Sequence, residues 1–225
     1  MAPSRTTVPW GVVVPVKVLA AAKSRLAAYG DPARERLALA FAVDVVTACL
    51  ACPAVARVLV VTDDPRAAAA LAALGAEVWP DHPDAGLNPA LAHGAELLRA
   101  ALGDCGVATV SSDLPTLRPQ DLAAALATVP PRGRAFVADA EESGTTLLAA
   151  APWADLLPAY GDGSRRRHLD SGAVELAAPA ALRRDVDTPA DLAQAVRLGV
   201  GERTAAVVQE LSAAGVHLDG ARWGA

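Results

Sequence analysis

The chain has 225 residues, of which 20 are basic and 25 are acidic, so its formal net charge is −5. This balance argues against a protein that binds nucleic acid or a membrane surface through bulk charge. Only two of the basic residues are lysines, and these two, Lys17 and Lys23, lie six positions apart. We attribute the remaining arginines to a high-GC coding background.

A chain of this length commonly folds as one α/β domain. We expect a single domain over residues 1–225, with a core at about 8–215 and a flexible C-terminal tail. Proline, glycine or a charge interrupts every apolar stretch before the ~18 residues of a membrane-spanning helix. The N-terminal segment partly resembles a signal peptide, but Pro15 and Lys17 split its apolar run. We therefore expect a cytoplasmic protein.

Cysteine usage agrees with that location, because three cysteines offer no disulfide framework. Cys49 and Cys52 form a C-x-x-C spacing at the end of an apolar helical pattern. No second Cys or His pair accompanies them in the sequence, so core packing is favoured over metal or redox chemistry.

Short β-branched runs alternate with Ala- and Leu-rich helical patterns along the chain, which is typical of a mostly parallel sheet covered by helices. The predicted strands are residues 12–16, 58–62, 77–79, 107–111 and 135–138. The predicted helices are residues 33–51, 65–74, 89–102, 119–127, 189–198 and 203–213. Residues 143–187 are richer in Gly, Ser and Arg, which predicts antiparallel strands and functional loops.

The segment after the first predicted strand carries three cations, Lys17, Lys23 and Arg25. Sheets of this kind usually hold nucleotide phosphates at the carboxyl end of the first strand. Neither a Walker motif nor G-x-G-x-x-G is present, and a solvated basic turn is the alternative. In a chain that otherwise uses arginine, two lysines here favour a site that needs a compact ammonium group.

Asp113 follows the predicted strand at residues 107–111. A carboxylate at the end of a central parallel strand projects into the crevice in which ligands bind, and its hard oxygen atoms suit Mg²⁺. An N-cap or turn aspartate is the alternative.

Asp185 and Asp187 are predicted to point to the same side of a short extended segment. The next residues, Thr188 and Asp191, have the spacing of a capping box, so they are explained by helix structure. Asp185 and Asp187 have no such explanation. Arg183 and Arg184 flank this segment in the sequence. We therefore interpret Asp185 and Asp187 as part of a metal and phosphate site.

Two loops rich in small residues are further candidates. The first, at residues 139–148, contains Gly144, Thr145 and Thr146, and the second, at residues 160–173, contains Gly161, Gly163 and Ser164. The second loop continues into Arg165, Arg166, Arg167 and His168. Anion capture and a solvated face remain alternatives for the arginines, and His168 is a candidate phosphate donor.

Asn88 precedes Pro89, and we interpret it as the N-cap of the predicted helix at residues 89–102. A loop at a helix N-terminus is also a natural place to hold a nucleotide.

With these motifs in order, the sequence resembles the guanylyltransferases that act on 2-phospho-L-lactate or phosphoenolpyruvate in the biosynthesis of coenzyme F-420. The matching stretches span residues 15–192 and read PVKVLAAAKSRL, VVTDD, GLNPAL, SSDLPTL, ESGTTLL, YGDGSRRRHLDSGAVEL and RRDVDTPADL. The resemblance implies a Rossmann-like, mostly parallel α/β sheet of the glycosyltransferase-A or nucleotidyltransferase type, with helices on both faces.

The resemblance also implies roles for single residues. Lys17, Lys23 and Arg25 would contact the triphosphate of GTP, Asn88 would lie near its guanosine, and Lys17, Lys23 and Asp113 would be catalytic. Asp113, Asp185 and Asp187 would hold Mg²⁺. Thr146, Gly161 and Ser164 would bind a small phosphorylated three-carbon acid.

Alternatives remain open at this stage. A related nucleotidyltransferase with a sugar phosphate or molybdopterin acceptor usually has a Gly-rich first loop, which this chain lacks. A nucleotide-sensing α/β module would use Asp63 and Asp64 as an acidic pocket. The sequence does not separate phosphoenolpyruvate from 2-phospho-L-lactate, although the bacterial branch of the family favours phosphoenolpyruvate. A downstream transferase of the same pathway and a second copy of the chain are conceivable partners.

Overall fold

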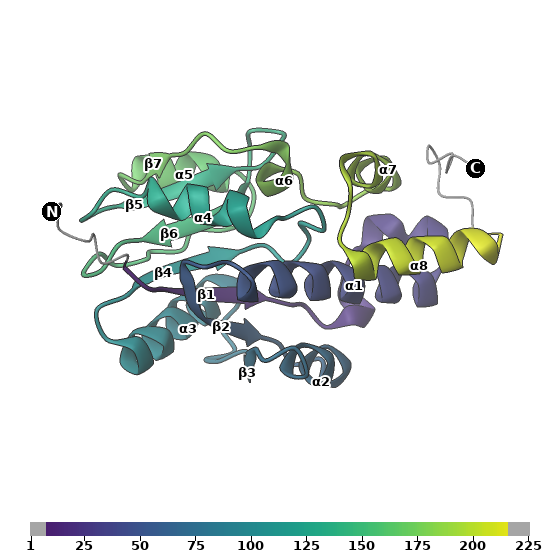
Figure 1. Ribbon diagram of the computed structural model, residues 1–225, viewed down its shortest axis with the longest axis horizontal. Helices are drawn as coiled ribbons and strands as arrows, with labels where there is room; N and C mark the ends of the chain where they lie inside the picture. The colour runs from purple at the N-terminus through teal and green to yellow at the C-terminus, as the bar shows by residue number, and fades with distance from the viewer. Residues whose placement is uncertain (1–7, 216–225) are drawn as a thin grey trace, which may run out of the picture.

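The computed structural model describes residues 8–215, and the predicted C-terminal tail lies outside them. Seven strands form one sheet in the order β3-β2-β1-β4-β6-β5-β7 (Figure 1). The strands are β1 Trp10–Pro15, β2 Val55–Val61, β3 Glu77–Trp79, β4 Gly106–Val110, β5 Arg134–Ala138, β6 Thr145–Ala150 and β7 Val174–Glu175. All neighbours pair in parallel except β6, which runs antiparallel to β4 and β5. The predicted fold class is confirmed.

Eight α-helices and two 3₁₀ helices are found in residues 8–215. They are η1 Leu19–Ala21, η2 Ser24–Tyr29, α1 Asp31–Leu50, α2 Pro65–Ala72, α3 Leu87–Leu102, α4 Pro119–Ala127, α5 Ser164–Asp170, α6 Ala180–Arg183, α7 Pro189–Leu198 and α8 Glu202–Ala213. The six predicted helices are all present. The stretch expected to be a loop at residues 160–173 contains the short helix α5.

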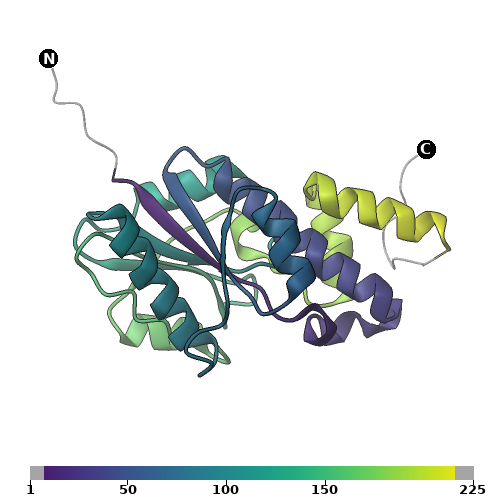
Figure 2. The same ribbon diagram turned by 90° about the horizontal axis from the view of Figure 1, so that it is seen from below.

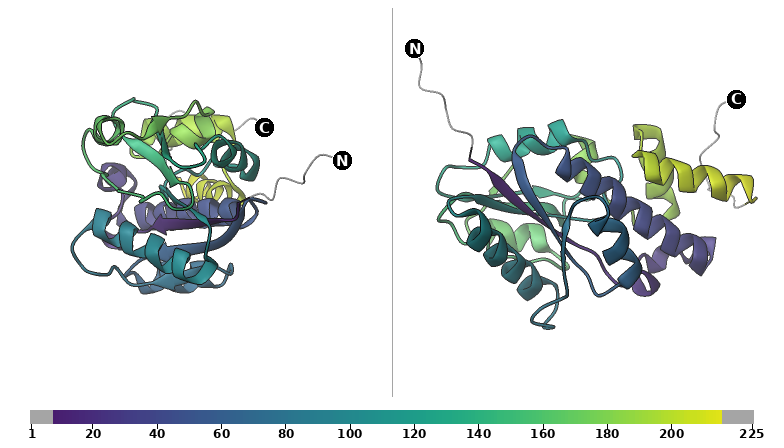
Figure 3. Two further views of the ribbon diagram at one scale, coloured as in Figure 1. Left: turned by 90° about the vertical axis from the view of Figure 1, so that its left-hand side faces the viewer. Right: turned by 60° about the horizontal axis from the view of Figure 1, so that its bottom comes forward.

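Alternation along β1 explains how the sheet is covered on both faces. Val12 and Val14 pack against α1 and α4, whereas Val13 faces the opposite layer with Leu91 and Leu98 of α3. All five side chains are buried, as the period of two in a strand requires. Figure 3 shows the layers from two further directions.

A third apolar cluster attaches the C-terminal helices to the N-terminal half of α1. Phe41 of α1 is packed with Leu192 of α7 and Val208 of α8. Figure 2 shows α1 extending past the sheet with α8 beside it. Val186 is buried in the same cluster, so the segment on either side of it is held beside α1 and α7.

Asp44 in α1 fixes the start of α8. Its carboxylate accepts hydrogen bonds from the backbone N–H groups of Arg203 at 3.0 Å and Thr204 at 2.8 Å, which caps two otherwise unpaired donors. A Cβ at Gly201 would lie 2.3 Å from Asp44 Cγ. Glycine is therefore required where α8 approaches α1.

Within residues 8–215, no helix combines the length and the apolar character that crossing a membrane requires.

Candidate active site

The sheet topology brings three distant segments of the chain to one edge. Strands β1 and β4 are parallel neighbours, so the loops that follow them leave from the same edge. The backbone carbonyl of Asp113, after β4, accepts a hydrogen bond from Val186 N at 3.0 Å. This bond places Asp185 and Asp187 beside the two loops.

Lys23 lies between two of the predicted metal ligands. Its Nζ donates to Asp113 Oδ2 at 2.5 Å and to Asp187 Oδ1 at 2.7 Å, although these residues are 90 and 164 positions away in the sequence. Arg25 is 3.7 Å from Asp187 Oδ2. The backbone of Lys23 has φ 53°, a left-handed conformation that costs roughly 1–2 kcal/mol outside glycine. The side chain of this strained residue is held by two ion pairs.

Asp113, Asp185 and Asp187 form a carboxylate cluster in which one oxygen from each residue lies within 4.8 Å of the others. Burial first, and then the neighbouring Asp113 and Asp187, raise the pKa of Asp185 to about 7. Burial also raises the pKa of Asp187, but Lys23 outweighs this effect and the net shift is downward. Lys23 thus forms ion pairs with two of the three carboxylates, Asp113 and Asp187.

The charge balance of Lys23 reflects the same cluster. Burial lowers the pKa of its ammonium group, but Asp113 and Asp187 outweigh burial, so the net pKa is raised above the usual value. Lys23 is therefore positively charged at neutral pH.

The residues present fit a divalent cation. Oδ1 of Asp113 is buried and has no hydrogen-bond partner among residues 8–215, which is costly for a carboxylate oxygen. Burial, together with the neighbouring Asp113 and Asp187, disfavours the charged form of Asp185 and raises its pKa, and a bound cation would favour the charged form. Carboxylate oxygens are the ligands that Mg²⁺ prefers.

Two cavities meet at the carboxylate cluster. We call the first, of about 300 Å³, the acidic cavity; Asp185, Asp187 and Gly161 are among its lining residues. We call the second, of about 210 Å³, the lysine cavity; it is lined in part by Lys17, Lys23 and Asp113. The cluster and Lys23 therefore stand between two spaces in which ligands can be held.

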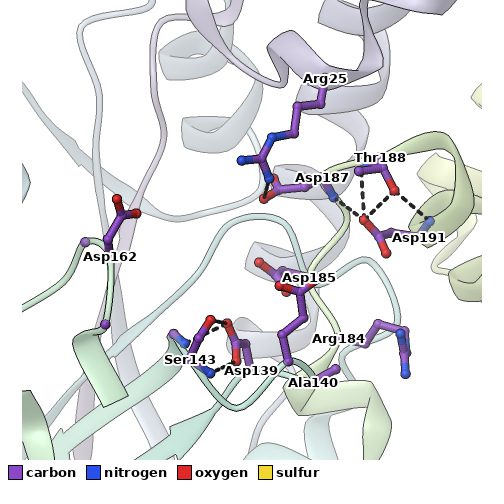
Figure 4. A pocket seen from close by; sticks show the side chains of 14 residues that line it. Arg25, Asp139, Ala140, Ser143, Asp162, Arg184, Asp185, Asp187, Thr188 and Asp191 are labelled. Atoms are coloured by element: carbon purple, nitrogen blue, oxygen red, sulfur yellow. Dashed lines mark hydrogen bonds and ion pairs between the residues drawn. The ribbon is translucent and has the colours of Figure 1, made fainter. Parts of the chain in front are cut away.

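Figure 4 shows how the acidic cavity is built. Arg25 reaches Asp187 from η2, and Asp139 holds the opposite wall. The Asp139 carboxylate accepts hydrogen bonds from Ser143 N at 2.9 Å and from Gly144 N at 2.8 Å. A Cβ at Gly144 would lie 2.4 Å from Asp139 Oδ2, so the tight loop requires glycine there.

Of the predicted acceptor-binding residues, Gly161 lies on the cavity wall, whereas Thr146 and Ser164 are buried. Gly161 lines the acidic cavity and has φ 116°, which favours glycine. The hydroxyl of Ser164 donates to Thr145 Oγ1 at 3.2 Å. The hydroxyl of Thr146 donates to the Leu182 carbonyl at 2.6 Å. Both hydroxyl groups are therefore engaged within the protein.

The arginines next to these loops are engaged within the protein. Arg165 pairs with Glu175, and Arg166 with Asp170. Arg167 donates to the carbonyls of Ala159 and Asp162. Arg183 donates to the carbonyls of Ala138 and Asp139 and pairs with Glu142.

Asn88 occupies a different place from the one predicted. The N-cap of α3 is Gly86, with φ 93°, so the prediction that Asn88 is the N-cap is wrong: the helix begins one residue before it. The Asn88 amide donates to the Tyr160 carbonyl at 3.1 Å and accepts from Tyr160 N at 2.7 Å. Asn88 thus anchors the segment that leads to Gly161.

Two residues that the sequence did not single out, Asp139 and Asp162, also line the acidic cavity, together with Arg184, which was expected beside the site. Nε of Arg184 is buried without a partner among the described residues. The adjacent glycines were the available signal for Asp162. The acidic pocket proposed for a sensing module is not favoured, because Asp64 caps α2 and accepts a hydrogen bond from Leu19 N.

Solved structures of other proteins share this fold. A Desulfovibrio desulfuricans protein described as a nucleotide-diphospho-sugar transferase superposes with a TM-score of 0.67 at 16% identity, over 91% of this chain and 95% of the other. A Mycobacterium tuberculosis protein solved with manganese superposes with a TM-score of 0.51 at 20% identity, over 85% of this chain and 99% of the other. These likenesses agree in sheet architecture.

Sequence comparisons are more specific. The family model of the MobA-like NTP transferase domain matches residues 18–178. The phosphoenolpyruvate guanylyltransferase of Thermomonospora curvata is 56% identical over 91% of this chain and 90% of its own length. The enzyme of the same name from Streptomyces coelicolor is 57% identical, over 92% of this chain and 99% of its own length. The chain is therefore a nucleotidyltransferase enzyme that belongs to the phosphoenolpyruvate guanylyltransferase family.

Proposed function

We propose that this chain transfers GMP from GTP to the phosphate of phosphoenolpyruvate and releases pyrophosphate, as a step in the biosynthesis of coenzyme F-420. The observation that carries the proposal is the position of the carboxylate cluster between the lysine cavity and the acidic cavity. The names of the relatives support the guanylyl group and the acceptor.

The reaction needs alignment and charge neutralisation more than proton transfer. A phosphate oxygen of the acceptor attacks the α-phosphorus of GTP in line, and the bond from that phosphorus to the bridging oxygen of the β-phosphate breaks. Because the second pKa of a phosphate monoester is about 6, the attacking oxygen is already ionised at pH 7. No general base is required, and the site must hold two anions in register.

Lys17 and Lys23 supply positive charge on the nucleotide side of this geometry. Both line the lysine cavity, where their ammonium groups would bind the triphosphate and stabilise the charge that develops on the leaving pyrophosphate. Arg25, at the edge of the acidic cavity, would add to this charge. The predicted guanosine contact of Asn88 stays a prediction.

Asp113, Asp185 and Asp187 would hold Mg²⁺. When bound, the ion would neutralise charge on the phosphate groups in a cavity that is otherwise lined by many carboxylates. Among the residues that line the acidic cavity are Asp139, Glu141, Asp162, Asp185, Asp187 and Asp191. Such a wall repels an anionic acceptor unless a cation compensates it.

On the acceptor side, we assign the three-carbon acid to the loop that contains Gly161 and Ser164. Gly161 lines the acidic cavity, and Ser164 is buried directly behind it at the start of α5. Thr146 shapes this region by tying β6 to Leu182. The product would be the substrate of a downstream transferase, which would transfer the phosphorylated acid and release GMP as the leaving group.

The test is pyrophosphate release by the purified protein with GTP and Mg²⁺. Phosphoenolpyruvate, 2-phospho-L-lactate, glucose 1-phosphate or no acceptor is added in turn, and the product is identified by mass. We expect turnover with phosphoenolpyruvate, little with ATP in place of GTP, and none with EDTA. Faster turnover with 2-phospho-L-lactate would change the acceptor, and turnover with the sugar phosphate alone would contradict the proposal.

A further inference from the structure

His168 is a fully buried side chain that none of the proposed chemistry uses. Its side chain has 0% exposure and its ring packs against Phe136 and Tyr160, with ring centroids 5.7 and 5.4 Å away. Both ring nitrogens are engaged: Nδ1 lies 2.9 Å from Thr145 Oγ1, and Nε2 accepts a hydrogen bond from Ala159 N at 3.0 Å.

These contacts fix the tautomer of His168. A backbone N–H can only donate, so Nε2 must carry a lone pair and Nδ1 must carry the proton. Nδ1 therefore donates to Thr145. Protonation of Nε2 would place a ring N–H group against the Ala159 N–H group and break their hydrogen bond. Burial first, and then Arg167 from α5 and Arg134 from β5, lower the pKa of His168 to about 4, so the ring is neutral at pH 7.

The two hydrogen bonds lead to the two ends of one loop. Ala159 lies at the start of residues 159–164, and Tyr160 beside it is held by Asn88. At the other end, the Ser164 hydroxyl donates a hydrogen bond to Thr145 Oγ1, the same oxygen that accepts the hydrogen bond from His168 Nδ1. Between these ends, Gly161, Asp162 and Gly163 line the acidic cavity.

This loop needs anchors because its backbone is permissive. Gly161 has φ 116° and Gly163 has φ 70°, and glycine populates many other conformations at little cost. A loop that is correctly shaped only part of the time lowers the apparent affinity for its ligand by that fraction. Anchoring both ends keeps the cavity wall in one shape.

Building on the proposed function, we propose that His168 is a positioning residue for the acceptor, which fixes residues 159–164 through Ala159 at one end and through Thr145 and Ser164 at the other. The nucleotide-side residues Lys17 and Lys23 are not part of this network. Asn88 touches it only through its own two hydrogen bonds to the Tyr160 backbone, which do not involve His168. The inference thus predicts an effect on the acceptor and not on GTP.

The test compares His168→Leu with two variants that each restore one bond. In His168→Asn the amide stands near the position of Nδ1, and in His168→Gln it stands near that of Nε2. We expect His168→Leu to raise the KM for phosphoenolpyruvate roughly tenfold, the size expected from losing two neutral hydrogen bonds, with the KM for GTP unchanged. The Asn and Gln variants should fall between Leu and wild type.

Thr145→Val cuts the same network one residue further along, and it also serves if His168→Leu does not fold. The double variant should raise the acceptor KM by less than the product of the two single effects. His93→Leu is the matched control, because His93 is an exposed histidine on α3 and should change neither KM.

Hydrogen exchange of the backbone amides of residues 159–164 is a second readout that does not depend on turnover. We expect faster exchange there in His168→Leu, with residues 139–144 unchanged. Unchanged exchange in residues 159–164, or equal increases in the KM for GTP and for the acceptor, would overturn the inference. Wild-type protein that releases no pyrophosphate with phosphoenolpyruvate would instead refute the proposed function, and the exchange measurement would still decide the role of His168.

Discussion

Two cation-rich segments border the candidate site, and the structure uses them in opposite ways. In the segment of residues 17–25, Lys23 is shared between Asp113 and Asp187, and Lys17 lines a cavity. In the segment of residues 165–168, each arginine is satisfied by the protein: Arg166, for example, forms an ion pair with Asp170 four residues later.

The difference lies in local charge balance. The arginine segment is neutralised by carboxylates and carbonyl oxygens of its own surroundings, so it builds the scaffold. Around Lys23 three carboxylates lie close together, and burial beside Asp113 and Asp187 raises the pKa of Asp185 to about 7. A buried group of charges that the protein leaves unbalanced is where a charged ligand is expected.

Asp113→Asn gives the largest expected effect on this comparison. It removes a carboxylate charge while the backbone carbonyl of Asp113 still accepts its bond from Val186. We expect kcat for Mg²⁺-dependent pyrophosphate release to fall by about 10³-fold or more. Asp104→Asn is the control and should behave as wild type, because Asp104 is exposed and precedes β4 whereas Asp113 follows this strand. Near-normal turnover in folded Asp113→Asn would rule out the metal assignment.

Lys23→Met should have the next largest effect. The ammonium group is lost while most of the side-chain volume is kept, so kcat/KM for GTP should fall by about 10²-fold. The variant also removes the ammonium group that Asp113 and Asp187 share, so its Tm without metal should drop and should recover more than that of wild type when Mg²⁺ is added. Arg132→Met, which removes an exposed cation, controls for net charge. A Tm response to Mg²⁺ equal to that of wild type would contradict the shared-charge view.

The buried histidine next to the arginine segment predicts a pH dependence of stability. The pKa of His168 is about 4 in the folded protein and about 6.5 in an unfolded chain. The unfolded state therefore binds the proton more readily as pH falls below 6.5, and folding stability decreases toward pH 4. His168→Leu lacks this loss.

Urea unfolding at several pH values measures the effect as a difference between two proteins. The stability of wild type relative to His168→Leu should shrink by about 2–3 kcal/mol between pH 7 and pH 4.5. The contributions of the other titrating groups, which the two proteins share, cancel in this difference of unfolding free energies. A constant difference across this range would show that His168 titrates normally in the folded state.

The architecture could be predicted because it is encoded locally. β-Branched runs and capping residues mark the strands and helices, and the capping box of Thr188 and Asp191 forms as its spacing predicts. Helix α5 was not predicted, because its seven residues are too few to show an apolar period. The start of α3 was misplaced because Gly86, and not Asn88, begins the helix.

The site was predictable as a set of residues but not as a geometry. Lys23 and Asp187 lie 164 positions apart, and their contact depends on the pairing of β1 with β4 and on the burial of Val186. Strand alternation indicates that Thr145 and Thr146 face opposite sides. It does not indicate that Thr146 bonds to Leu182 while Thr145 faces His168.

Arg166→Ala gives the smallest expected effect and tests the other half of the comparison. The Arg166 side chain is 81% exposed and pairs with Asp170, and an exposed pair at this spacing contributes only about 0.3–0.5 kcal/mol. We expect a change in unfolding free energy of at most about 0.5 kcal/mol and unchanged KM values for GTP and phosphoenolpyruvate. A rise in the acceptor KM would mean that Arg166 leaves Asp170 to bind the anion. The arginine segment would then belong to the site after all, because an ion pair this exposed costs little to exchange for a ligand.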